Sequence, residues 1–181
     1  MKYFLVLVAL VGLLSIPMVA QDYPKAEVFG GYQFLHTGTI HVAGQDIPDS
    51  SENWNGWDAG ATGYFNKYFG VQGDFSGSYK TINHVSGHVY TYAGGPVIAY
   101  REGKVNPFVH ALFGGSHFTA SASGAGSGSN NGFTMMYGGG ADIKMSKILA
   151  LRGQVDWVYF HVSGISLTNN VRVATGIVLR F

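Results

Sequence analysis

Apolar and polar side chains alternate with a period of two through almost the whole chain after residue 20. Successive side chains of a β-strand point to opposite faces, so this alternation predicts strands. In the last segment one face carries Val171, Val173, Ile177, Leu179 and Phe181, and the other face carries Arg172, Ala174, Gly176 and Arg180. We expect eight strands, at residues 25–36, 54–66, 69–80, 88–100, 105–116, 132–144, 148–160 and 170–181.

The connections between these strands alternate in length. Short turns are expected at Asn66–Tyr68, Arg101–Lys104 and Met145–Lys147. Longer loops are expected at Thr37–Asn53, Thr81–Gly87, His117–Asn131 and His161–Asn169. All but the last residue of the spacer-like run "SASGAGSGSNNG" lies in the third of these loops. This alternation predicts an antiparallel up-and-down sheet with all short turns at one end.

Side-chain size decides which face of the sheet points inward. The interior of an eight-stranded barrel is just wide enough for its side chains to fill it. We therefore expect the face of Gly, Ser, Thr and Ala to line the interior and the bulky face to contact lipid. The bulky set is Phe34, Trp57, Phe65, Tyr92, Ile98, Phe113 and Trp157. The predicted fold class is all-β, an eight-stranded antiparallel up-and-down transmembrane β-barrel.

Aromatic residues gather near the predicted strand ends. Phe65, Phe69, Tyr100 and Phe181 lie beside the short turns, and Trp54, Tyr79, Tyr90 and Tyr159 lie beside the long loops. Two such girdles are typical of a barrel that crosses a bilayer.

The first residues have the pattern of a secretory signal peptide. Lys2 precedes an apolar run that ends at the small residue Ala20, which predicts cleavage there. The alternative is an uncleaved membrane anchor. We expect residues 1–20 to be the signal peptide and 21–181 one barrel domain. Without Lys2 the chain has ten basic and ten acidic residues, so no basic surplus points to nucleic acid or anionic lipid. The chain has no cysteine, so no disulfide can stabilise the fold.

Four segments, "AEVFGGYQFL", "YTYAGGPVIAYREGKVNPFVHALFGG", "GGGADIKMSKILALRGQVDW" and "GIVLRF", resemble the OmpA-type small eight-stranded outer-membrane β-barrel family. The resemblance implies a monomer in outer-membrane lipid, with both termini periplasmic and insertion by the barrel assembly machinery. That machinery reads a signal in the last strand. Gly176, Leu179 and Phe181 match this signal, whereas Ala174 stands where a polar residue is usual.

Charged residues on the predicted inward face are nearly balanced. We expect Glu27 to pair with Arg180 and Asp142 with Arg152, in a polar network that plugs the lumen, because an unpaired buried charge is costly. The alternative is a path for ions or small solutes. The candidate network is Glu27, Asp58, Asp74, Asp142, Lys144, Arg152, Asp156, Arg172 and Arg180.

No catalytic, cofactor or metal site is predicted. His110 should face the lumen, and no histidine pair has convincing metal-ligand spacing. Two "HVS" runs, His84–Ser86 and His161–Ser163, suggest a lipid-A-modifying enzyme but have no acid nearby to complete a triad. Gly138–Gly140 lies inside a strand and is not a phosphate-binding loop.

We expect a non-enzymatic barrel with a structural, surface-exposed or adhesive role. The alternatives are a small or gated pore, the enzyme, and a soluble lipocalin-type ligand-binding barrel.

Overall fold

One antiparallel sheet forms the whole of the protein that the structure describes. This computed structural model describes residues 24–38, 40–42, 45–47, 51–82, 85–122, 126–163 and 165–181. The strands are β1 (Ala26–Thr37), β2 (Ile40–Val42), β3 (Gln45–Ile47), β4 (Glu52–Tyr64), β5 (Phe69–Ile82), β6 (Val85–Ala99), β7 (Val105–Ala122), β8 (Gly126–Lys144), β9 (Leu149–Val162) and β10 (Ile165–Arg180). Within these ranges, no helix is long and apolar enough to cross a membrane.

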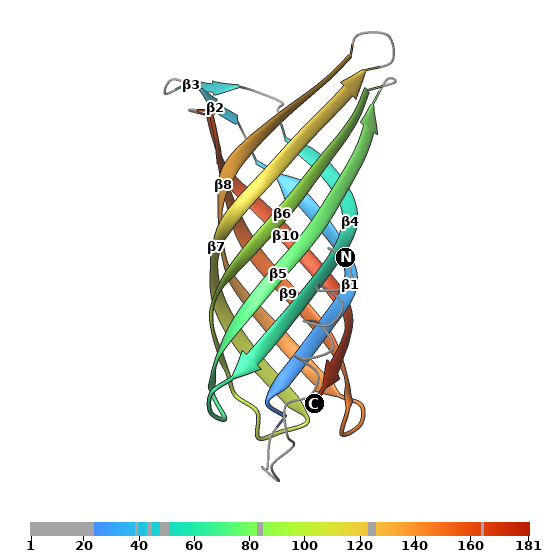
Figure 1. Ribbon diagram of the computed structural model, residues 1–181, viewed down its shortest axis with the longest axis vertical. Coiled ribbons are helices and arrows are strands. Elements are labelled where there is room, and N and C mark those ends of the chain that lie inside the picture. Colours follow the sequence, from blue (N-terminus) through green and yellow to red (C-terminus); the bar gives the residue numbers. More distant parts are fainter. Residues whose placement is uncertain are drawn as a thin grey trace, which may run out of the picture.

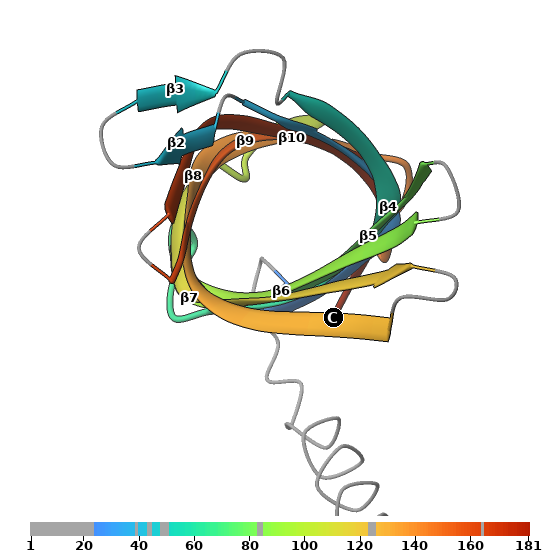
Figure 2. The ribbon, with the colours of Figure 1, turned by 90° about the horizontal axis from the view of Figure 1, so that it is seen from above.

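Eight of the strands form a closed barrel, with β2 and β3 as an additional hairpin outside its wall (Figures 1 and 2). The barrel closes where β1 pairs with β10, from Glu27 opposite Arg180 to His36 opposite Val171. Beyond this ladder the Phe181 amide donates to the Ala26 carbonyl at 2.9 Å, and the Lys25 amide donates to the Phe181 carbonyl at 2.7 Å. The wall therefore has no unpaired edge at the point where the two ends of the sheet meet. The predicted fold class, an eight-stranded up-and-down barrel, is confirmed.

The strands are longer at the loop end than the sequence predicts. β7 and β8 stay paired up to Ala122 opposite Gly126, so most of the expected spacer "SASGAGSGSNNG" is strand. Small and polar residues carry no apolar face, but their backbones still pair when the neighbouring strand continues beside them. The hairpin of β2 and β3 was also not predicted. It lies within the expected loop Thr37–Asn53 and pairs with β10 through His41 opposite Ser166.

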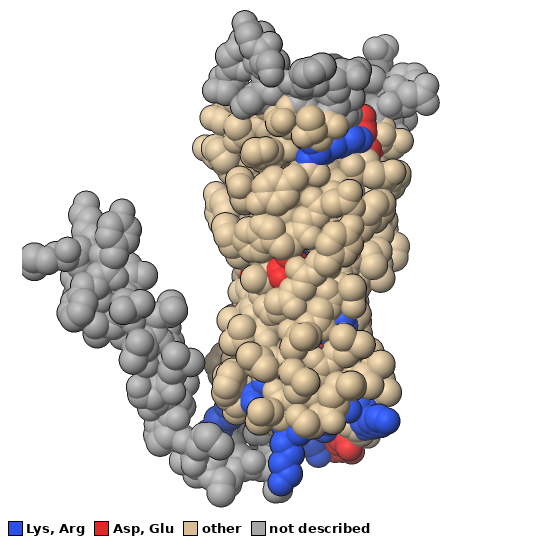
Figure 3. All heavy atoms as spheres, turned by 90° about the vertical axis from the view of Figure 1, so that its right-hand side faces the viewer, with Lys and Arg blue, Asp and Glu red and all other residues tan. Residues whose placement is uncertain are grey.

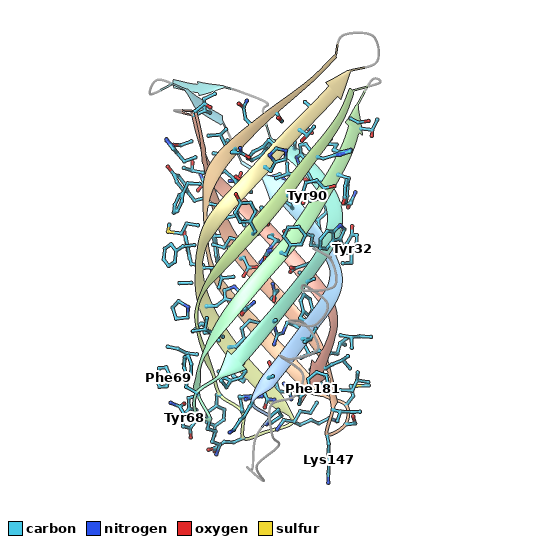
Figure 4. The ribbon with its side chains drawn as sticks, viewed as in Figure 1. Tyr32, Tyr68, Phe69, Tyr90, Lys147 and Phe181 are labelled. Carbon is cyan, nitrogen blue, oxygen red and sulfur yellow. The ribbon has the colours of Figure 1, made fainter. Side chains whose placement is uncertain are left out.

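The bulky apolar face points outward, as predicted. Phe65, Tyr92, Ile98, Phe113 and Trp157 are all exposed on the outer surface. In the space-filling view the middle of the barrel is almost free of charged atoms, which gather near its two ends (Figure 3). Figure 4 shows Phe69 and Phe181 projecting from the lower part of the wall, in the girdle expected beside the short turns. The prediction for Trp54 is wrong: this ring packs against a buried apolar cluster inside the barrel.

A hydrogen-bonded cluster joins two of the short turns. The Tyr68 and Tyr100 rings stack at 6.4 Å between centroids, and the hydroxyl groups of both donate to the Glu102 carboxylate, at 3.0 and 2.9 Å. Lys67 Nζ donates to the same carboxylate at 2.5 Å. The hydrogen bond from Lys67, followed by those from Tyr100 and Tyr68, lowers the pKa of Glu102 to about 2. This carboxylate therefore stays ionised well below ordinary pH.

Glycines allow β1 and β10 to approach closely where the barrel closes. A Cβ atom added at Gly31 would lie 2.2 Å from the Thr175 carbonyl oxygen, and one added at Gly176 would lie 2.3 Å from the Gly30 carbonyl oxygen. Gly30 differs, because a Cβ added there meets no atom within 4 Å. The closure thus depends on the absence of side chains at specific positions.

We expect Gly31→Ala to destabilise the barrel by about 1–3 kcal/mol, the usual cost of forcing an extra methyl group into a filled site. The neighbouring change Gly30→Ala is the matched control and should shift stability by no more than about 0.5 kcal/mol. Urea unfolding of the folded protein in detergent, followed by tryptophan fluorescence, measures both. Equal midpoints for the two variants would contradict the close approach at Gly31.

Candidate functional site

The lumen holds two clusters of charged side chains and is the candidate functional site. The turn-side cluster consists of Glu27, Arg101, Asp142, Arg152 and Arg180. The mid-barrel cluster consists of Asp58, Asp74, Asp156, Arg172 and His110. All ten side chains are buried. Among the described residues no hydrogen bond or ion pair joins one cluster to the other, so the two form separate networks.

Two carboxylates and three guanidinium groups make up the turn-side cluster. Arg152 donates to both Asp142 oxygens, from Nε at 2.7 Å and from Nη2 at 2.9 Å, and Nη2 also lies 3.1 Å from Glu27 Oε2. Arg180 Nη2 donates to Asp142 at 2.9 Å, and its Nε lies 3.2 Å from Glu27 Oε1. Arg101 Nη2 donates to Glu27 at 2.6 Å. Bidentate and shared contacts of this kind are the strong class of ion pair.

Aromatic side chains cover the guanidinium groups of this cluster. The Arg101 guanidinium lies 4.0 Å from the centre of the Tyr64 ring, and that of Arg152 lies 4.4 Å from the centre of the Phe108 ring. Stacking on a ring compensates part of the hydration that a buried cation loses. This explains how the narrow interior accommodates three arginines together.

Arg172 is the centre of the mid-barrel cluster. Its Nη1 and Nη2 donate to the two oxygens of Asp74 at 2.8 and 3.1 Å, and its Nε donates to Asp156 at 2.9 Å. Asp58 Oδ1 is farther away, at 3.8 Å from Arg172 Nη1. One guanidinium therefore faces three carboxylates.

His110 is the second cationic candidate in this cluster. Its Nε2 lies 2.7 Å from Asp156 Oδ1 and its Nδ1 lies 3.0 Å from Gln72 Oε1. Both ring nitrogens thus face acceptors, an arrangement that a protonated imidazole satisfies with two donated hydrogen bonds. A charged His110 with the four arginines would balance the five carboxylates of the lumen.

An apolar layer lies inside the barrel on the loop side of the charged clusters. The ring of Phe160 packs edge-on against Phe118, with centroids 5.4 Å apart, and the Trp54 ring also joins the layer. The fully buried members are Leu35, Val89, Leu112, Met136, Val158 and Phe160. The sequence pattern predicted small and polar side chains on the inward face and missed this layer.

Lys144 and Arg101 are placed differently from the sequence expectation. Lys144 is half-buried, and its Nζ contacts the Arg101 carbonyl oxygen at 3.3 Å rather than a carboxylate of either cluster. It lies at the end of β8, where a long side chain can reach water. Arg101 was assigned to a short turn, although Val97 and Ala99 before it face inward and the period of two continues to residue 101. That continuation is the signal that identifies it.

The three residues of the expected assembly signal lie on the last strand. Leu179 and Phe181 are exposed on the outer face of the barrel, and Gly176 faces the Gly30 carbonyl across the closing ladder. Gly176 belongs to the inward face of β10, whereas Leu179 and Phe181 belong to the outward face.

The other sequence candidates do not assemble into a reactive site in the described part of the chain. His161 Nδ1 lies 2.9 Å from Ser166 Oγ, a serine that the sequence did not indicate, and no carboxylate bonds to His161 among the described residues. His84 lies outside the described residues, as does the expected signal peptide. Gly138–Gly140 lies inside β8. No group of three His, Asp or Glu side chains within the described ranges is arranged to hold a metal ion.

Comparisons with solved structures show the same fold. No family model matches the chain, and no curated protein matches it. Ail, the attachment invasion locus protein of Yersinia pestis, has a TM-score of 0.61 and 18% identity, over 88% of this chain and 99% of that chain. Neisserial surface protein A has a TM-score of 0.72 and 10% identity, over 89% and 100%. The outer membrane protein OprG from Pseudomonas aeruginosa has a TM-score of 0.56 and 10% identity, over 90% and 98%. The chain therefore has the fold of the small eight-stranded outer-membrane β-barrels, as its sequence resemblance implied.

We expect Arg172→Met to destabilise the protein by about 3–5 kcal/mol, because it leaves buried carboxylates without their guanidinium partner. Adding Asp74→Asn to Arg172→Met should recover part of that loss, since the two residues share an interaction energy. The outward neighbour Val173→Leu is the control and should change stability by no more than about 0.5 kcal/mol. Urea unfolding of the wild type, Arg172→Met, Asp74→Asn, the double variant and Val173→Leu forms the test, and strictly additive effects of the Arg172 and Asp74 changes would contradict the direct pairing.

Proposed function

We propose that this protein is an integral outer-membrane β-barrel with a non-enzymatic structural, surface-exposed or adhesive role. The observation that carries the proposal is the distribution of side chains across the wall. Large apolar residues face outward around the middle of the barrel, and the charges inside are buried and paired. A monomer with so large an apolar surface would aggregate in water, whereas a barrel that spans a bilayer requires such a surface.

The closed ladder supports the same proposal. In hydrocarbon an unpaired backbone amide or carbonyl costs several kcal/mol, so a sheet can cross a bilayer only as a closed barrel. The pairing of β1 with β10 provides that closure. In the proposed orientation the short turns and both termini lie in the periplasm, and the long connections lie outside the cell.

A surface role is favoured by the extension of the strands at the loop end. β7 and β8 remain paired beyond the apolar band and rise above the rest of the barrel in Figure 1. Such a projecting ribbon is a suitable contact surface for another molecule. Two structures of the same fold carry names of this kind, an attachment invasion locus protein and a surface protein, and we extend that role to this chain as part of the proposal.

The other function classes fit the site less well. A soluble lipocalin-type barrel needs its bulky apolar face inside, and here most of that face is outside. An enzyme of the Ser-His-acid type needs a group that orients the imidazole, and His161 has only Ser166 and no acid among the described residues. The small or gated pore remains the second candidate, because paired charges in a lumen can also line an ion path.

Electrical recording separates the plugged barrel from the pore. We expect the wild-type protein in planar bilayers to show no steady conductance, because the apolar layer and the two charged clusters fill the interior. Phe160→Ala should introduce brief currents by opening space in the apolar layer, and Leu151→Ala on the outer face should not. Steady conductance of the wild type would replace the plugged barrel with the pore.

Insertion of the barrel can be tested in the same preparation. A closed, folded barrel should migrate differently in SDS before and after boiling, and identical mobility for protein recovered from membranes would contradict the membrane barrel itself. This result is independent of conductance, so the fold in the membrane and the plug are judged separately.

We further propose that the barrel assembly machinery recognises the last strand through Gly176, Leu179 and Phe181. Phe181→Ser should lower the amount of folded, heat-modifiable protein in the outer membrane of expressing cells, whereas Phe69→Ser, a girdle residue on β5, should lower it much less. Refolding of both purified variants in detergent controls for intrinsic stability. Equal folded yields in cells for Phe181→Ser and the wild type would refute recognition through Phe181.

A further inference from the structure

Four histidines lie on the outer face of the barrel near its loop end. They are His36 on β1, His88 on β6, His117 on β7 and His161 on β9, which we call the histidine collar. Each occupies an outward-facing position of its strand. An outward aromatic side chain lies two or four residues away in the same strand, namely Tyr32, Tyr90, Phe113 or Tyr159. Neither the lumen nor the proposed plug uses these side chains.

Neighbouring strands hold three of the imidazoles in place. His36 Nδ1 lies 2.7 Å from Asn53 Oδ1, and His117 Nδ1 lies 2.7 Å from Asn131 Oδ1. His161 Nδ1 lies 2.9 Å from Ser166 Oγ. In each case the Nε2 atom has no hydrogen-bond partner among the described residues. These rings therefore have one nitrogen oriented by the wall and the other available to a ligand.

The collar lies directly on the loop side of the aromatic girdle. His88 and His161 are the next outward residues beyond Tyr90 and Tyr159, and His117 lies opposite Tyr90 in the β6–β7 ladder. Figure 4 shows Tyr90 in the upper part of the barrel, far above Phe69 and Phe181 of the lower girdle. Aromatic girdles mark the boundary between hydrocarbon and headgroups. If the membrane orientation proposed above holds, the collar lies at the headgroup level of the outer leaflet.

The described surroundings of the collar contain no fixed charge on the outer face. The cross-strand neighbours are Val171 and Asn53 for His36, Tyr79 and Thr119 for His88, Tyr90 and Asn131 for His117, and Phe133 and Ser166 for His161. Lys80 and Glu52, charged residues of this end of the barrel, pair with each other. The tyrosines are the other titratable groups beside the rings. Protonation of the histidines would thus supply this band with positive charge, and no carboxylate among the described neighbours of the rings cancels it.

We propose that the histidine collar binds the phosphate groups of anionic lipid headgroups, and binds them more tightly in mildly acidic conditions. Histidine changes its charge between about pH 5 and 8. A protonated ring offers its outer N–H to a phosphate oxygen as a charge-assisted hydrogen bond. The amide groups of Asn53 and Asn131 and the hydroxyl group of Ser166 add neutral donors beside three of the rings. The collar would then be a pH-dependent lipid contact encircling much of the barrel.

The test uses the full chain reconstituted in phosphatidylcholine vesicles that contain spin-labelled phosphatidylglycerol or spin-labelled phosphatidylcholine as the probe. The measured quantity is the preference of the protein surface for the anionic probe at about pH 5 and about pH 8. For the wild type we expect that preference to be about five-fold higher at the lower pH, the gain typical of one added cation beside an anionic surface. The variant H36Q/H88Q/H117Q/H161Q should lose this difference.

A control at the other end of the barrel separates the collar from general electrostatic attraction. Lys104 and Lys147 are exposed in the short turns, at the opposite end of the barrel from the collar. The variant K104Q/K147Q should lower the preference equally at both pH values and leave the difference between them intact. The collar is overturned if the four-histidine variant keeps the wild-type difference, or if the folded wild type shows none. Failure of the wild type to enter phosphatidylcholine vesicles in a heat-modifiable form would instead count against the proposed membrane barrel.

Discussion

Closure of the sheet between β1 and β10 is the interaction on which the rest of the structure depends. It pairs the two ends of a single meander and leaves the wall without an edge. Because eight strands are joined in this way, the interior is narrow and its contents are severely limited. The close contacts at Gly31 and Gly176 show that the closure itself restricts sequence, since neither position has room for a side chain.

The narrow interior explains why its charges occur as compact clusters. A buried guanidinium needs several oxygen partners, and Arg172 finds them in Asp74 and Asp156 while Arg152 finds them in Asp142 and Glu27. Aromatic rings and an apolar layer lie beside these clusters inside the barrel. The charged interior and the apolar exterior are consequences of one alternation along the strands, which assigns every second residue to each side.

That alternation also decides what the sequence could predict. It identified the strands, their order, and most residues of both charged clusters, because the parity of a strand places each side chain on a face. The prediction missed Arg101 because the alternation of inward and outward residues was not extended from the strand into the turn. It misplaced Trp54 because an aromatic residue near a strand end resembles a girdle residue. The apolar layer and the long pairing of β7 with β8 depend on contacts between distant strands, which alternation along one strand does not report.

The separation of the two charged clusters makes the barrel electrically polar along its axis. The turn-side cluster has three arginines for two carboxylates, whereas the mid-barrel cluster has three carboxylates for Arg172 and His110. With His110 protonated, the enclosed charge sums to zero but its positive part lies nearer the short turns. The interior then forms a dipole parallel to the barrel axis, held in a medium that screens it poorly. A voltage across the surrounding membrane would therefore give the barrel different energies in its two opposite orientations across that membrane, even though no net charge is enclosed.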